Sequence, residues 1–260
     1  SLNLVEVRDE FIALKSGQDN RFSGSTNWVH NNFVGCFLQA YVPFARTCPF
    51  YAGFDSFICL AKGNLRHFLE VCHTSLKQID QSEGVRDLQV PIADQAESAR
   101  QASSDFLREI RSFGVFGNQL FDFANGLGRL FAAAHRRPTQ SEPEINHFSI
   151  TGGVTSLDEA ERELLSEATK WSVLFELDET KIKGSVDVAE SEWMLAPIYA
   201  PHFNITFRKK RRLELSRDDL RRLMTGETHE RTQVIEKYKR RWSVDIVDEG
   251  PTLFDGLTDT

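Results

Sequence analysis

The sequence predicts a mainly α-helical protein of the α+β class, with helices first and short antiparallel β-hairpins later. Apolar residues recur every three or four positions, the spacing of a helix, through most of the first 135 residues. Alternation with a period of two, which is typical of strands, begins only near residue 145. Hydrophobic residues make up 40% of the chain and charged residues 27%, which is ordinary for a globular protein with a real core.

The first helix is expected from residue 26 to about residue 40. Residues 1–25 before it are polar and read as a linker or flexible loop. One face of the helix carries the apolar residues Trp28, Val29, Phe33, Cys36, Phe37 and Ala40.

Two more helices are expected on either side of a Gly-Asn step. A short helix over 51–61 stops before Gly63, which suits a left-handed C-cap. Asn64 is well placed as the N-cap of a helix over 65–78. The buried stripe of this helix is predicted to consist of Leu65, Phe68, Leu69, Cys72 and Leu76.

Two long helices follow a linker at residues 82–91. The first, over 92–113, is rich in alanine, and the second covers 118–135. Gly126 and Gly128 indicate close helix packing, because no strand precedes their Gly-Leu-Gly sequence and the third glycine of a dinucleotide-binding loop is missing. The core face of the second helix is predicted to hold Leu120, Phe123, Ala124, Leu127, Leu130 and Phe131.

Strands are expected only in the later part of the chain. Residues 145–151 read as an edge strand, and alternation predicts further strands at 173–178, 193–199 and 203–207. The basic run 208–212 is expected to continue the last of these strands.

Three helices accompany these strands. A Ser-Leu-Asp-Glu capping pattern at Ser156 predicts a helix to about residue 171, and two further helices are expected at 216–223 and 228–242. The acidic tail, residues 246–260, is expected to be peripheral, with Leu253 and Phe254 able to dock it.

Charge is distributed unevenly along the chain. The net charge is −7, yet residues 208–241 contain 13 Lys and Arg against 6 Asp and Glu. One interpretation is a surface that binds the phosphates of double-stranded DNA. The other is a solvated edge strand whose cations prevent aggregation. The candidate nucleic-acid-binding residues are Arg208, Lys209, Lys210, Arg211, Arg212, Lys239, Arg240 and Arg241; Trp242, beside them, is a candidate for base stacking.

Other sites receive little support from the sequence. The four cysteines match no common zinc spacing and read as free thiols of a cytoplasmic protein, and no metal ligands are predicted. Glu142, Glu144 and His147 lie close in sequence but have no nucleophile or metal partner, so they read as solvated polar residues and no catalytic residue is proposed. No apolar run approaches the roughly 20 residues of a membrane span.

Helical units followed by short hairpins have the outline of winged-helix modules. Within this outline, Phe57–Glu70, with its Gly-Asn-Leu-Arg step, resembles the lid-domain sensor segment of origin-recognition-complex-like AAA+ ATPases. The bacterial members, many of them linked to phage defence, are the most similar. Residues 193–212 resemble a C-terminal winged-helix module of the same family.

This resemblance implies a nucleotide-sensing role for Arg66, with Asn64 beside it. In such ATPases the lid arginine approaches the γ-phosphate of ATP. The alternative for Arg66 is a surface ion pair with Glu70. No G-x-x-x-x-G-K-[ST] loop and no Walker B strand occur in this sequence, so ATP and Mg²⁺ are expected only with a preceding ATPase domain, and this chain alone should not hydrolyse ATP.

The expected organisation has five parts: a linker at 1–25, a lid-like domain at 26–82, winged-helix-like modules at 83–152 and 153–245, and a tail at 246–260. The chain, which begins with Ser-Leu-Asn, reads as the C-terminal regulatory and DNA-recognition portion of a longer protein. The alternative function is a protein-interaction scaffold, which would bind a partner subunit or another copy of itself without touching DNA.

Overall fold

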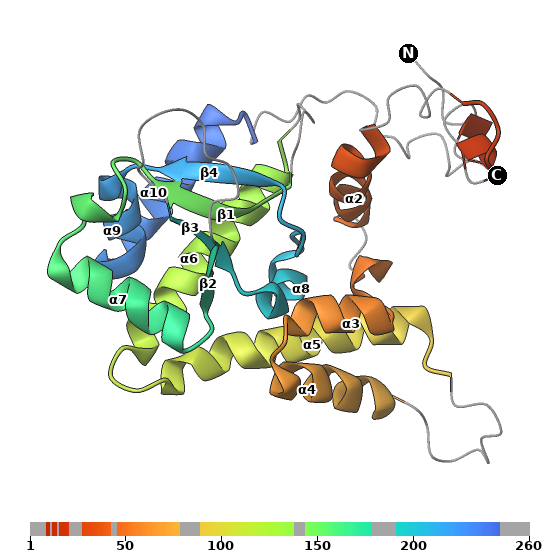
Figure 1. Cartoon of the computed structure of the whole chain (residues 1–260), viewed down its shortest axis with the longest axis horizontal. Helices are drawn as coiled ribbons and strands as arrows, with labels where there is room; N and C mark the ends of the chain where they lie inside the picture. Colours follow the sequence, from red (N-terminus) through yellow and green to blue (C-terminus); the bar gives the residue numbers. More distant parts are fainter. Residues whose placement is uncertain are drawn as a thin grey trace.

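A computed structural model describes residues 9–10, 12–14, 16–20, 28–42, 46–78, 89–137, 144–177 and 191–244. Figure 1 shows α2 to α5 on one side of the molecule and the strands with α6, α7, α9 and α10 on the other. The predicted acidic tail and most of the predicted linkers at 1–25 and 82–91 lie outside the described residues.

Most predicted helices are confirmed. Asn64 is the N-cap of α4, as predicted, because its side chain accepts hydrogen bonds from two backbone N–H groups of the first turn. The expected core face of α6 is confirmed, with all six residues fully buried. The helices of the first half are α2 (Trp28–Tyr41), α3 (Phe54–Ala61), α4 (Leu65–Leu76), α5 (Ile92–Glu109) and α6 (Gly117–His135), with short 3₁₀ turns η1 (Pro49–Tyr51) and η2 (Ile110–Ser112).

The predicted buried stripe of α4 is wrong for three of its five residues, while Phe68 and Cys72 are half-buried against the core. Leu65 is 67% exposed, and Leu69 and Leu76 are also exposed. The helix instead buries His67, Val71, Thr74 and Ser75 as it packs against α3 and α5. The residues of both faces of this helix recur with helical spacing, so the spacing alone does not show which face is buried. In the structure the more polar face packs against α5. A similar rotation in α2 buries Val34 and Leu38 and leaves Phe33 exposed.

The strands form one mixed sheet with the order β2-β3-β1-β4. β1 pairs antiparallel with β3 and parallel with β4, and β2 pairs antiparallel with β3. The prediction of an edge strand at 145–151 is therefore wrong, since β1 is internal and every residue in it is buried. The strands are β1 (Ile145–Ile150), β2 (Leu174–Leu177), β3 (Glu192–Leu195) and β4 (Arg211–Leu215).

This sheet joins the two modules that the sequence suggested on either side of residue 152. β1 comes from the expected first module, whereas β3 and β4 come from the second. The strand predicted over 203–207 does not form. Residues Pro197–Tyr199 (η4) and Ala200–Phe203 (α8) are helical, and Asn204 turns the chain through a left-handed conformation.

Three further helices complete the sheet-bearing part: α7 (Glu159–Lys170), α9 (Arg217–Thr225) and α10 (Thr228–Arg241). α6 packs against β1, β3, α9 and α10. α7 begins with a capping box between Asp158 and Glu161, two residues later than the Ser156 pattern predicted, after the 3₁₀ turn η3 (Val154–Ser156). Within the described part of the chain, no helix has the length and apolar character needed to cross a membrane.

Candidate functional site

Arg66 lies on the first turn of α4 and is held by a carboxylate of α5. Its Nη1 and Nη2 atoms each lie 2.7 Å from an oxygen of Glu109, and the guanidinium also lies 5.4 Å from the centre of the Phe106 ring. The Arg66 side chain is still 65% exposed. The surface interpretation named Glu70 as its partner, but the fork is directed at Glu109, whose hydrogen bond raises the pKa of Arg66.

This geometry orients the guanidinium without enclosing it. His67 next to it is buried against the Phe106 ring and stays neutral, because burial, with Arg66 nearby, lowers its pKa to about 4. Any phosphate that reached Arg66 would have to compete with Glu109 for the same two donors. A bidentate contact with a phosphate is as favourable geometrically as one with a carboxylate.

Three of the five predicted cations at 208–212 are engaged by buried or nearly buried carboxylates. Arg208 pairs with Glu144 at 2.6 Å, and Glu144 is only 1% exposed. Lys209 and Arg212 both pair with Glu192, at 2.7 and 3.3 Å. These pairs hold the segment that leads into β4 against β1 and β3. Much of the positive charge in residues 208–212 therefore stabilises the fold.

The prediction that Glu144 and His147 are solvated is wrong. Glu144 directly precedes β1, and His147 lies within it, 3.8 Å from Glu192. Burial lowers the pKa of His147 to about 4, so its ring is neutral near pH 7. Sequence reasoning missed Glu192 altogether. A useful signal was the position of a lone glutamate at the start of an otherwise apolar strand, Trp-Met-Leu-Ala.

A second group of cations, which we call the basic edge, consists of Arg137, Arg211, Arg240 and Arg241 together with Trp242. The Arg137 guanidinium lies 5.1 Å from the centre of the Trp242 ring, and Trp242 directly follows α10. Burial and the nearby Arg211 lower the pKa of Arg137. Arg240 and Arg241 are exposed on the last turn of α10, while Lys239 pairs with Glu236.

Lys210 directly precedes β4, and burial and the nearby Arg208 lower its pKa. The structure thus separates the predicted nucleic-acid-binding residues into two groups. Arg208, Lys209 and Arg212 make internal ion pairs, whereas Arg211 lies close to Arg137, and Arg240 and Arg241 are exposed in the last turn of α10. The cysteines are free thiols, and the described residues contain no group of three His, Cys, Asp or Glu side chains arranged to hold a metal ion.

A family model described as ORC-CDC6-like matches residues 10–215. The chain belongs to the ORC-CDC6-like family. This ORC-CDC6-like match includes Asn64, Arg66 and the run 208–212, and it ends with the last residue of β4. Helices α9 and α10, and with them the Arg240 and Arg241 part of the basic edge, follow the matched region. No curated protein and no solved structure matches the chain.

Proposed function

We propose that this chain is the regulatory and nucleic-acid-binding portion of an origin-recognition-like AAA+ ATPase, and that it contacts duplex DNA through the basic edge. The observation that carries this proposal is the Arg137–Trp242 contact, which joins the end of α6 to the end of α10. Arg137 also lies close to Arg211, and the exposed Arg240 and Arg241 directly precede Trp242 in the chain. Family membership supports a protein that interacts with nucleic acid or with other proteins.

The two groups of cations contribute differently to this binding. A cation already paired with a buried carboxylate neutralises a DNA phosphate only by giving up that partner, which would leave the carboxylate buried and uncompensated. Arg208, with Glu144 beneath it, is the clearest case. Exposed arginines such as Arg240 and Arg241 carry no such cost, so they contribute most to DNA affinity.

Duplex DNA binding measured against salt concentration tests this assignment. The double variant Arg240→Gln, Arg241→Gln should bind more weakly, and the slope of log K against log salt should fall by roughly 0.9 for each phosphate that the variant no longer neutralises. The control is Lys77→Gln, Arg221→Gln, which removes two positive charges from exposed positions of α4's C-terminus and α9. Equal salt slopes in both variants, or no DNA binding by the parent protein at low salt, would refute the proposal.

The second part of the proposed function is nucleotide sensing by Arg66, with ATP and Mg²⁺ supplied by a preceding ATPase domain. Its support is the exposed, pre-oriented fork of Arg66 beside the Asn64 cap. In the protein that includes such a domain, Arg66→Gln should reduce ATP hydrolysis. Glu109→Gln removes the competing acceptor while leaving Arg66 in place, so it should preserve or increase the response to ATP. A loss of hydrolysis in Glu109→Gln equal to that in Arg66→Gln would contradict a sensor role.

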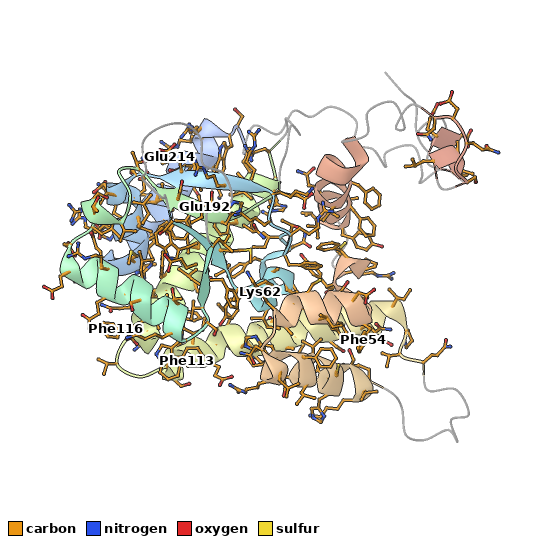
Figure 2. The ribbon with its side chains drawn as sticks, in the orientation of Figure 1. Phe54, Lys62, Phe113, Phe116, Glu192 and Glu214 are labelled. Atoms are coloured by element: carbon orange, nitrogen blue, oxygen red, sulfur yellow. The ribbon has the colours of Figure 1, made fainter. Side chains whose placement is uncertain are left out.

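One observation favours the alternative, a protein-interaction scaffold. The outer faces of α3 and α4 expose large apolar side chains, and Phe54, labelled in Figure 2, is one of them. Exposed apolar side chains that form one contiguous face are typical of protein interfaces. The residues are Phe54, Ile58, Leu65, Leu69 and Leu76. Light scattering of the Leu65→Ser, Leu69→Ser variant tests for self-association, which the substitutions should weaken if this face is an interface.

We also propose a role in antiviral defence, which infection assays in a host would test.

A further inference from the structure

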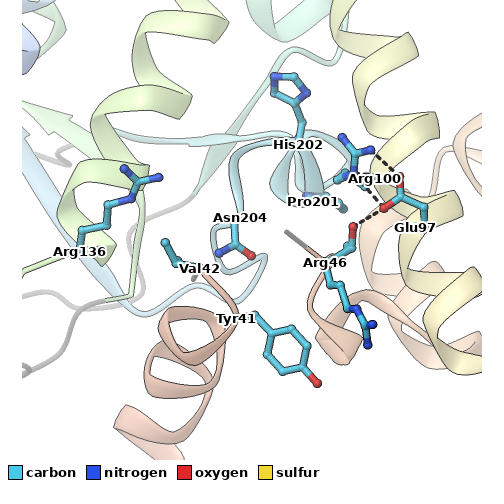
Figure 3. Close-up of a pocket in the computed structure, with 10 residues that line it drawn as sticks. Tyr41, Val42, Arg46, Glu97, Arg100, Arg136, Pro201, His202 and Asn204 are labelled. Carbon is cyan, nitrogen blue, oxygen red and sulfur yellow. Dashed lines mark hydrogen bonds and ion pairs between the residues drawn. The ribbon is translucent and has the colours of Figure 1, made fainter. Parts of the chain in front are cut away.

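A second concentration of arginines surrounds an open cavity of about 520 Å³. Its lining shares no residue with the basic edge, although Arg136 directly precedes Arg137 in the chain. Figure 3 shows Arg136 on one side of this cavity and Arg46 and Arg100 on the other. Its lining comes from the end of α2, the segment before η1, the middle of α5, the end of α6 and the tip of α8. We call it the arginine pocket; its residues are Tyr41, Val42, Arg46, Thr47, Glu97, Arg100, Arg136, Pro201, His202 and Asn204.

The charge of the arginine pocket is positive. Among the described residues that line it, Glu97 is the only carboxylate, and it is engaged by Arg100 on α5 and by the Thr47 hydroxyl. The hydrogen bond from Arg100 lowers the pKa of Glu97, so that these two charges cancel near neutral pH. Arg46 and Arg136 remain, and both are exposed to the cavity.

The ends of α2 and α6 reduce this charge but do not reverse it. Each helix C-terminus carries about half a negative charge, so the two ends together offset about one of the two remaining guanidinium groups. His202 adds no charge, because burial, with Arg100 and Arg108 nearby, lowers its pKa. A net positive charge is left in a concave site, and a concave wall concentrates the field of such a charge.

The polar groups of the wall are fixed in place. The His202 ring is hydrogen-bonded through Nδ1 to the Ser104 hydroxyl at 2.8 Å, and the Asn204 amide donates to the Leu38 carbonyl at 3.2 Å. Behind Val42, Arg136 and Asn204 lies a smaller cavity lined by His135. His135 is 3% exposed.

The volume of the arginine pocket indicates the size of its ligand. Small-molecule sites typically measure about 300–1,000 Å³, which is much larger than a single phosphate ion requires. Tyr41 and Pro201 add apolar surface to the lining. Planar guanidinium groups with paired donors bind phosphate oxygens particularly well.

We propose that the arginine pocket binds a phosphorylated small molecule of nucleotide size, with Arg46 and Arg136 contacting its phosphate groups from opposite sides. This site does not include Arg66, which is paired with Glu109 at the end of α5, 12 positions along that helix from the Glu97 carboxylate. It therefore does not depend on the proposed nucleotide sensor, and it shares no residue with the basic edge.

Calorimetric titration of the whole chain with pyrophosphate and with ADP tests the proposal. The variant Arg46→Gln, Arg136→Gln should weaken the binding of both probes at least about tenfold, which corresponds to about 1.4 kcal/mol. The charge-matched control Lys77→Gln, Arg221→Gln should bind like the parent protein. Arg46 lies in an irregular exposed segment, so the single variant Arg46→Gln gives a second test if the double variant unfolds at a lower temperature.

Four results would overturn the proposal. The first is the absence of pyrophosphate and ADP binding by the parent protein. The second is equal binding by the parent and the pocket variant. The third is loss of binding in Arg66→Gln with retention in the pocket variant, which would place the ligand at the sensor arginine. The fourth result comes from titration with a single-stranded oligonucleotide. If only the oligonucleotide binds, and the pocket variant binds it more weakly than the parent protein, then the pocket binds a nucleic-acid backbone and the small-molecule proposal is wrong.

Discussion

Gly128 in α6 lies directly beneath the ring of Phe203 at the end of α8. A Cβ atom added at Gly128 would lie 2.2 Å from Cε2 of Phe203, well inside van der Waals contact. The ring is itself buried in the core. The close helix packing predicted from the Gly-Leu-Gly sequence is confirmed here, and the glycine allows α8 to approach α6.

We expect Gly128→Ala to destabilise the protein by about 1–3 kcal/mol, because the Phe203 ring would have to move within a packed core. Gly126→Ala is the matched comparison, since its added Cβ would lie 3.2 Å from a Leu223 side-chain carbon. Urea unfolding of both variants measures the difference. A free energy of unfolding for Gly128→Ala at or above that of Gly126→Ala would show that α8 moves away without cost.

Tyr51 links the helical part of the chain to the segment before β4. Its hydroxyl donates a hydrogen bond of 2.8 Å to the carbonyl of Ile205, and the side chain is fully buried. Tyr51→Phe should lower the free energy of unfolding by about 1–2 kcal/mol, because the carbonyl of Ile205 would lose this donor in the interior. Thermal unfolding measures it, with Tyr41→Phe, at a partly exposed position, as the control.

Glu192 holds two cations of the basic run, Lys209 and Arg212. We expect Glu192→Gln to lower the free energy of unfolding by about 1–3 kcal/mol, since a neutral amide replaces a charged acceptor that is nearly buried while its partners are partly exposed. The DNA affinity of this variant should change little or increase, because Lys209 and Arg212 become available to phosphates. A loss of DNA affinity in a folded Glu192→Gln protein would contradict the structural role assigned to these pairs.

The same carboxylate contributes to acid sensitivity. Burial acts to raise the pKa of Glu192, but Lys209 and Arg212 hold it below its usual value of 4.5. A carboxyl group whose pKa is lower in the native protein than in the unfolded chain stabilises the fold at every pH above its unfolded pKa. This contribution is lost as the pH falls below about 4.5. Glu192→Gln should therefore flatten the stability profile below that pH.

Buried histidines predict a second pH dependence at higher pH. Burial lowers the pKa of His135 to about 4, compared with its usual 6.5, so the unfolded chain binds a proton there more readily than the native protein. Stability should fall as the pH drops from about 6.5 towards 4. His135→Phe removes one such proton and should reduce the slope over this range by up to about 1.4 kcal/mol per pH unit. A slope that is unchanged in His135→Phe would mean that this ring is already charged in the native protein.

The helices could be predicted from local signals, whereas the sheet could not. Asn64 as an N-cap and the core face of α6 depend on neighbours within a few residues, and both are confirmed. The strand order depends on pairing between Ile145–Ile150 and Arg211–Leu215, which are some 60 residues apart and carry no local record of each other. Leu65, Leu69 and Leu76 of α4 were wrongly predicted to be buried for the same reason. Helical spacing identifies a face of the helix, but only tertiary packing determines which face is buried.

The candidate site was partly predictable. The residue types of Arg66 and the basic run were evident, but their partners were not, because Glu109, Glu144 and Glu192 come from distant segments. The arginine pocket had no sequence signal at all, since its cations come singly from different elements. A cluster of adjacent cations is conspicuous in a sequence, although here many of them are already neutralised.

The position of β1 in the sheet has a consequence for any attempt to divide this protein. Both hydrogen-bonding neighbours of β1 are supplied by residues later than 190. A chain shortened at residue 152 would expose a strand that is otherwise buried along its whole length, with two open edges, and such a strand is a template for strand addition by other molecules. We expect such a fragment to aggregate, and only chains that extend at least through β4 to remain monodisperse.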